Sequence, residues 1–191
     1  MSKNRFREQS LAPGTDSVLV RATVDGKLAG HAFATFWAYK CRKTGWITQL
    51  CVGRDFRRNG LATKILLNLR KNEHDRSFGI LSSHPAAVRA VLRAFGSGIK
   101  DADLSMMKEL APAIMESSPV SYVKMSKPMG SLFDQSDQTG AICCADTGFW
   151  VDHAEPEAAL NITKKDGIKW PFGDLPDGCE FLVFVSRSSA T

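Results

Sequence analysis

The sequence lacks any uninterrupted apolar run of membrane-spanning length, and its first residues lead into no apolar signal core. We therefore expect a cytoplasmic protein without a membrane partner. Cysteine is also sparse, with five in 191 residues and none in Cys-x-x-Cys spacing. An odd number without that spacing indicates neither a disulfide framework nor a zinc site, so no metal is expected.

Basic residues are not gathered into a stripe, although the formal net charge is +5. Scattered charge of this kind does not favour a nucleic-acid partner, and a polyphosphate ligand explains a local excess equally well. The composition, 43% hydrophobic and 24% charged in 191 residues, is ordinary for one globular domain with a substantial core.

Residues 46–69 carry the clearest local pattern in the chain. Residues 46–52 are apolar and bounded by glycines, which predicts a strand. A basic turn follows, Arg57-Arg58-Asn59-Gly60. Apolar residues then recur at helical spacing, at Leu61, Ala62, Ile65, Leu66 and Leu69. The pattern predicts a strand, a basic turn and a helix in that order.

The basic turn has the features of an anion-binding site. The first N–H groups of a helix have no internal partner, and the macrodipole adds partial positive charge there. Gly60 allows a ligand to approach the backbone closely, while Arg57 and Arg58 supply full charges nearby. The alternative is an ordinary strand, turn and helix with a solvated basic loop.

This stretch resembles the acetyl-CoA site of the GNAT acyltransferase superfamily. The family pattern Arg/Gln-x-x-Gly-x-Gly/Ala is met by Arg57, Gly60 and Ala62, after a strand that ends at Val52. The resemblance implies an α/β (α+β) fold, with a GNAT-like mixed, mostly antiparallel central sheet, flanking helices and a splayed parallel pair of strands at the cofactor site. It also implies acetyl-CoA as the acyl donor. The residues implied to bind it are Leu50, Cys51, Val52, Arg57, Arg58, Asn59, Gly60, Leu61, Ala62, Thr63 and His84.

Periodicity and turn signals predict the remaining elements. Further strands are expected at 17–24, 28–39, 78–83, 148–153 and 180–186, with a short one around 120–125. Asp25-Gly26 predicts a hairpin turn, and residues 40–45 a polar loop. Helices are expected at 85–95, 103–116 and 156–164, the second kinked or shortened by Pro112.

We expect these elements to form a single domain over residues 1–191. Its expected parts are a cofactor-binding core at 17–96, an insertion at 100–147 and C-terminal strands at 148–191. Members of the family begin with a strand and two helices that wall the acceptor-amine pocket, yet only residues 1–16 precede the first expected strand. This predicts an N-terminally shortened member, or a wall supplied by the insertion or by a second subunit.

The usual proton carriers of the family have no counterpart here. Many members place a Glu on the cofactor strand, where this chain has Thr48 and Gln49. Many also place a Tyr on the second helix, at the position that aligns with Val91. Neither usual carrier can therefore move the proton of the attacking amine.

The candidate catalytic residues are His153 and Asp152 on the expected late strand, with Glu180 opposite them. Imidazole has an ordinary pKa near neutral pH, which suits a base. The only two tyrosines, Tyr39 and Tyr122, are interpreted as packing residues rather than acids.

Three functions remain open from the sequence. The leading hypothesis is an acyl-CoA-dependent N-acyltransferase that transfers an acetyl group to an amine of a small molecule or peptide by direct attack. The second is a GNAT-fold module that binds acyl-CoA or a protein partner without turnover. Nucleic-acid binding is the weakest, because no aromatic platform accompanies the charge. A monomer or a homodimer is expected.

Overall fold

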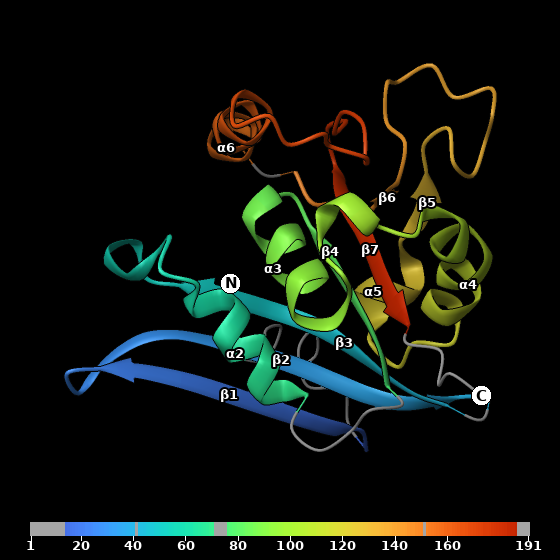
Figure 1. Ribbon diagram of the computed structural model, residues 1–191. Coiled ribbons are helices and arrows are strands. Elements are labelled where there is room, and N and C mark those ends of the chain that lie inside the picture. Colours follow the sequence, from blue (N-terminus) through green and yellow to red (C-terminus); the bar gives the residue numbers. More distant parts are fainter. Residues whose placement is uncertain (1–13, 41, 71–75, 151, 187–191) are drawn as a thin grey trace.

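One seven-stranded sheet runs through the residues that the computed structural model describes, 14–40, 42–70, 76–150 and 152–186, in the order β1-β2-β3-β4-β7-β6-β5 (Figure 1). The strands are β1 (Asp16–Val24), β2 (Lys27–Tyr39), β3 (Arg42–Val52), β4 (Arg76–Ser82), β5 (Lys127–Met129), β6 (Cys144–Asp146) and β7 (Cys179–Ser186). β3 and β4 are parallel, and every other neighbouring pair is antiparallel. This confirms the predicted mixed, mostly antiparallel sheet.

The hairpin between β1 and β2 turns at Asp25 and Gly26, which have φ of 48° and 75°. Positive φ at both positions is what a two-residue turn of this kind requires, so the sequence signal was sufficient. The loop predicted over 40–45 is wrong from residue 42 onward, because β3 begins at Arg42 and pairs with β2. Gly45 lies within the strand and pairs with Phe36. A glycine fits there because a Cβ would stand 2.5 Å from the Phe36 ring.

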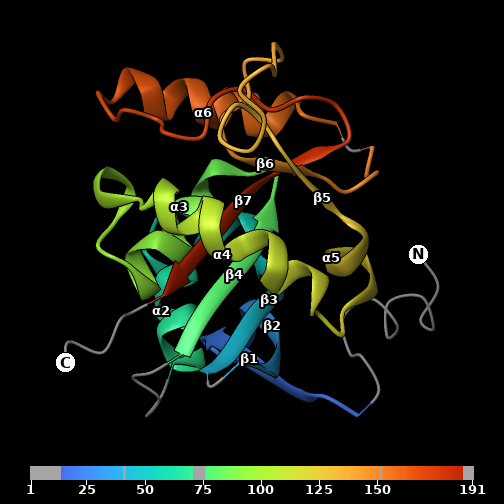
Figure 2. The same cartoon turned by 90° about the vertical axis from the view of Figure 1, so that its right-hand side faces the viewer.

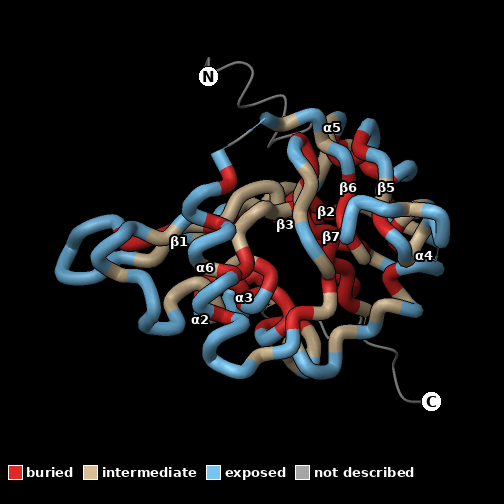
Figure 3. Tube along the Cα trace, turned by 90° about the horizontal axis from the view of Figure 1, so that it is seen from above, coloured by how far each residue is buried: buried red, intermediate tan, exposed pale blue. Residues whose placement is uncertain are grey.

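Helices α2 (Leu61–Leu69) and α3 (Pro85–Phe95) lie together on one face of the sheet (Figure 1). Their apolar stripes are buried, and Phe95 of α3 stacks on Phe78 of β4 with ring centroids 3.8 Å apart. The α2 and α3 segments were both predicted from their periodicity. Figure 3 shows that the buried residues gather along β7 and α3.

Helices α4 (Leu104–Glu116) and α5 (Ser121–Met125) lie on the opposite face of the sheet, as Figure 2 shows. The Trp37 indole Nε1 of β2 donates a hydrogen bond to Ser117 Oγ at the end of α4, at 3.1 Å. The shortening predicted at Pro112 is wrong, because α4 continues to Glu116. Burial of the apolar stripe through Ile114 outweighs the hydrogen bond that a proline removes.

Two predicted strands are absent from the described residues. The segment expected as a strand at 120–125 is α5, since Val120 and Val123 are both buried at helical spacing. Residues 148–150 and 152–153 form no strand, and Val151 lies outside the described residues. The strand that pairs with β7 on the side away from β4 is β6 instead.

β6 ends early because the chain turns immediately after it. The Asp146 carboxylate accepts a hydrogen bond from the Gly148 N–H at 2.9 Å, and Gly148 has a φ of 64°. A left-handed residue held in this way ends the pairing with β7.

Helix α6 (Ala154–Lys165) follows and lies beside the start of α3 (Figure 1). No helix in the described part of the chain combines the length and the apolar character needed to cross a membrane.

Candidate functional site

The parallel strands β3 and β4 separate part of the way along their length. They pair over residues 43–47 and 76–80, but β3 continues to Val52 and β4 to Ser82. The separation begins where Thr48 forms a bulge in the pairing of β3 with β2. The result is the splayed parallel pair that the family resemblance implies. We call the space between the two strand ends the β3–β4 gap.

A basic turn joins the end of β3 to α2. It begins with a short 3-10 helix, Arg54–Phe56, and contains two left-handed residues, Arg58 (φ 64°) and Gly60 (φ 71°). The first helical hydrogen bond of α2 runs from the Lys64 N–H to the Gly60 carbonyl at 3.1 Å. The N–H groups ahead of it, which have no acceptor within the helix, are those of Leu61, Ala62 and Thr63.

The space in front of this helix start is open. A Cβ built on Gly60 would have no neighbouring atom within 4 Å. Asn59 and both neighbouring arginines are exposed in the same turn. The turn therefore offers unpaired amides and positive charge to an anion without any displacement of the chain.

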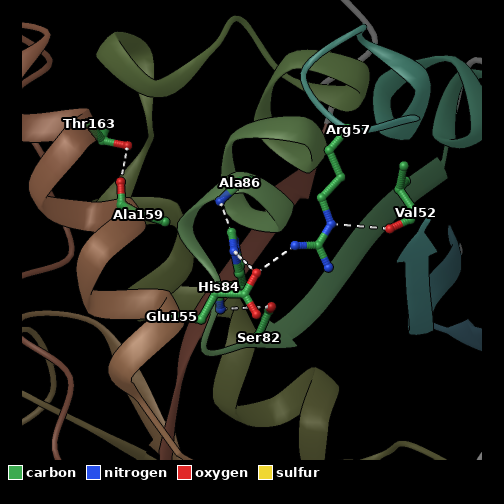
Figure 4. Close-up of polar contacts among 8 residues, drawn as sticks. All are labelled: Val52, Arg57, Ser82, His84, Ala86, Glu155, Ala159 and Thr163. Atoms are coloured by element: carbon green, nitrogen blue, oxygen red, sulfur yellow. Dashed lines mark hydrogen bonds and ion pairs between the residues drawn. The ribbon is translucent and has the colours of Figure 1, made fainter. Parts of the chain in front are cut away.

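A polar bridge crosses the mouth of the β3–β4 gap (Figure 4). Arg57 donates through Nε to the Val52 carbonyl at 3.2 Å, and its Nη1 forms an ion pair with Glu155 at the start of α6. The Glu155 carboxylate also lies 4.0 Å from His84 Nε2. Figure 4 shows the three side chains pointing toward one another from the turn, α6 and the start of α3.

His84 stands on the β4 side of this mouth and caps α3. Its Nδ1 accepts a hydrogen bond from the Ala86 N–H at 3.1 Å, so in the neutral ring the proton is on Nε2, facing Glu155. Partial burial lowers the pKa of His84, and the Glu155 charge opposes that shift. The hydrogen bond from Arg57 holds the pKa of Glu155 below its usual range. At neutral pH the bridge is a carboxylate between a guanidinium and a predominantly neutral imidazole.

The residues predicted to bind the cofactor surround the gap. Leu50, Cys51 and Val52 lie on the separated end of β3, and His84 lies across from them. Desolvation raises the pKa of the Cys51 thiol, which disfavours the reactive thiolate at neutral pH. Val91, aligned with the family's tyrosine, is fully buried in the core.

The candidate catalytic residues Asp152 and His153 lie just before α6, not on a strand. Asp152 is exposed, and its carboxylate accepts a hydrogen bond from the Ala154 N–H at 2.9 Å. His153 is only 8% exposed and lines a cavity of about 250 Å³ together with Ser83 and Phe181. Its Nε2 has no hydrogen-bond partner among the described residues.

Sequence analysis named Glu180 opposite His153, but it did not predict the residues that Glu180 joins on the face that carries α4 and α5. Tyr122 of α5 and Glu180 of β7 interact electrostatically, and Trp46 of β3 lies beside the phenol. No sequence signal joins these residues, because only the pairing of β7 beside β4 and the position of α5 bring them together.

A comparison with protein-family models identifies the class to which this fold and gap belong. Residues 2–95 match the sequence model of the Acetyltransferase (GNAT) family. Residues 2–95 are thus a GNAT acetyltransferase family domain, which includes the turn, the gap and α3. Membership implies an acyl-CoA-dependent acetyltransferase, for which acetyl-CoA is the typical donor. A comparison with curated proteins finds no match.

Proposed function

We propose that the protein is an N-acyltransferase that transfers an acetyl group from acetyl-CoA to an amine of a small molecule or a peptide by direct attack. One observation carries the proposal, the opening of the β3–β4 gap directly beside the unpaired amides of α2. A thioester in the gap and a pyrophosphate at the helix start are then held by adjacent parts of one cofactor.

The pyrophosphate is assigned to the backbone amides of residues 58–62. Gly60 leaves space for it, and the exposed arginines of the turn add charge. The pantetheine arm would run along the separated end of β3, whose outer edge has no β4 partner beyond Ile47. Backbone N–H groups near Leu50 to Val52 would stabilise the oxyanion that forms when the amine attacks.

The polar bridge at the mouth of the gap bears on this binding. Glu155 neutralises Arg57, one of the two arginines that would hold phosphate. A bound phosphate must therefore compete with the carboxylate or displace it. The pair is exposed, so its strength is modest and depends on salt.

In this proposal residues 17–96 are the cofactor-binding core of one domain over 1–191. The later segments contribute side chains to the same site, because α6 supplies Glu155 at the mouth of the gap. The acceptor amine would then contact residues outside the cofactor-binding core.

Calorimetry with acetyl-CoA tests the proposal. We expect one site per chain, and much weaker binding of acetylpantetheine, which has the thioester arm but lacks the pyrophosphate. Affinity for acetyl-CoA should fall with added salt, because phosphate contacts are partly ionic. Absence of acetyl-CoA binding, or equal affinity for the two compounds, would contradict the assigned site.

A second function is favoured by one observation, the lack of an acid or base at the usual positions. Thr48 and Gln49 cannot accept a proton at neutral pH, and Val91 is buried. A module that binds acyl-CoA without turnover would share the gap and the turn. Thiol release in the presence of primary amines separates the two functions, since only the enzyme releases CoA at a rate that depends on the amine.

A further inference from the structure

Glu180 is held at the end of β4, where that strand has already left β3. The next residue, Phe181, pairs with Ser82, and the Ser83 backbone amide acts to lower the pKa of the Glu180 carboxyl group. Pairing of β3 with β4 ends earlier, at Ile80. Glu180 therefore lies on the β4 side of the gap, beside the end of β4.

The alternation of β7 places Glu180 on the face opposite α2 and α3. Phe184 of β7 pairs with Gly79, and a Cβ on Gly79 would stand 2.2 Å from the Trp46 ring. Because side chains alternate along a strand, Glu180 lies on the same face of β7 as Phe184. Tyr122 reaches this face from α5 and interacts with the Glu180 charge.

The cavity that His153 lines is on the other face, because it is bounded by Phe181, the neighbour of Glu180 on β7. His153 and Glu180 are thus two separate candidates for the proton acceptor, one on each side of the sheet.

The surroundings of Glu180 suit a base that works near neutral pH. Burial raises its pKa to about 7, and the Ser83 N–H opposes part of that shift. The titratable group that faces it is the Tyr122 phenol, whose own pKa is raised by burial and by the Glu180 charge, so it is neutral. No cation among the described residues of β4, β6 or α5 contributes to the Glu180 pKa.

Two buried polar groups of β3 lack partners, one near the end of the β3–β4 pairing and one at the residue where the gap begins. Trp46 Nε1 and Thr48 Oγ1 have no hydrogen-bond acceptor or donor in the described residues, and the indole N–H is not aligned on the phenol beside it. An unsatisfied buried group of this kind destabilises the folded protein. A ligand in the gap would lie beside Thr48, which is one residue past the end of the β3–β4 pairing.

We propose that Glu180 is the catalytic base that accepts the proton of the attacking amine. The proposal rests on the proposed function. The amine nitrogen forms a bond to the thioester carbonyl carbon, its N–H proton passes to the Glu180 carboxylate, and the C–S bond breaks to release the CoA thiolate. The thiolate takes a proton from water, and Glu180 returns its proton to solvent, so the products are an amide and free CoA.

Glu180→Gln tests the assignment, because it keeps the size of the side chain and removes the base. We expect acetyl-CoA affinity within about twofold of the wild type, and kcat/KM for the acceptor lower by roughly 100-fold or more. The wild-type rate should rise with pH to a plateau, with a midpoint near 7. This rising part of the pH–rate profile, the acidic limb, should vanish in the variant. Glu157→Gln, an exposed carboxyl group on α6, is the matched control.

His153→Asn decides between the two faces. Retention of the limb in this variant and its loss in Glu180→Gln support the proposal. A limb that vanishes with His153, or a Glu180→Gln enzyme with the wild-type rate and profile, overturns it. If Glu180→Gln does not fold, Glu180→Asp serves, since the shortened carboxylate should lower kcat and leave acetyl-CoA affinity intact. Lack of acetyl-CoA binding or of turnover in the wild type would instead contradict the proposed function.

Discussion

Gly60→Ala has two effects that can be measured separately. It strains the left-handed backbone of the free protein, and it places a methyl group in the space assigned to the ligand. Gly60 has a φ of 71°, so an alanine there is strained, but its Cβ would touch no protein atom within 4 Å. The cost to the free protein is then the left-handed backbone alone, about 1–2 kcal/mol of the free energy of unfolding. Gly26 in the β1–β2 turn is a matched control, since it has a φ of 75° and equally open space.

The two variants should differ in cofactor binding. If the pyrophosphate occupies the open space, the new methyl group at position 60 displaces it from the α2 amides. Loss of one charge-assisted hydrogen bond, about 1.5–3 kcal/mol, weakens acetyl-CoA affinity by roughly 10- to 100-fold. Calorimetry measures the affinity and denaturant unfolding the stability. Gly26→Ala should lose similar stability and keep its affinity, and wild-type affinity in Gly60→Ala would refute the phosphate assignment.

Three further variants or conditions probe the rest of the site. Glu155→Gln should raise acetyl-CoA affinity about two- to tenfold at low salt by freeing the guanidinium beside it, and weaker binding in calorimetry would show that the carboxylate supports the site. Gly79→Ala would place a Cβ 2.2 Å from the Trp46 ring and should lower the free energy of unfolding by about 1–3 kcal/mol, whereas a wild-type melting temperature would contradict that packing. Because the folded-state pKa of Glu180 is raised to about 7, the folded protein binds the extra proton, so stability should fall as pH rises from about 4.5 to 7. Glu180→Gln should flatten that slope in denaturant titrations, and an unchanged slope would place its cause in another group.

The cofactor side of the site could be predicted because its signals are local. A basic turn with Gly60 before a helical stripe specifies the strand, the left-handed residue and the helix start within a few residues. Pro85 at the start of α3 acts in the same way, because a missing N–H is harmless in the first turn.

The acceptor side could not be predicted because its contacts join distant segments. Arg57 and Glu155 are 98 residues apart in sequence and meet only through the position of α6. The neighbours of Glu180 are Ser83, after β4, and Tyr122 of α5. The sequence of β7 does not indicate that either will lie beside it. Tyr122 packs against the core, as predicted, but its proximity to Glu180 could not be predicted for the same reason.

The errors in secondary structure also come from long-range pairing. β6 has only three residues, Cys144–Asp146, and pairs with both β5 and β7. A strand this short shows too little alternation to be recognised from the sequence. The strand was predicted instead over the aromatic stretch that follows it. Trp150 in that stretch is 80% exposed, so aromatic content there does not reflect burial in the sheet.

Transfer of a labelled acetyl group tests the central claim most directly. The protein is incubated with acetyl-CoA labelled in the acetyl carbon and with a set of primary amines and peptides, and the amide product and free CoA are quantified by mass spectrometry. We expect label in an amide in amounts equal to the CoA released, at a rate that depends on the amine and on the enzyme. Tight binding of acetyl-CoA with no labelled amide above the uncatalysed rate would contradict the account and identify a binding module.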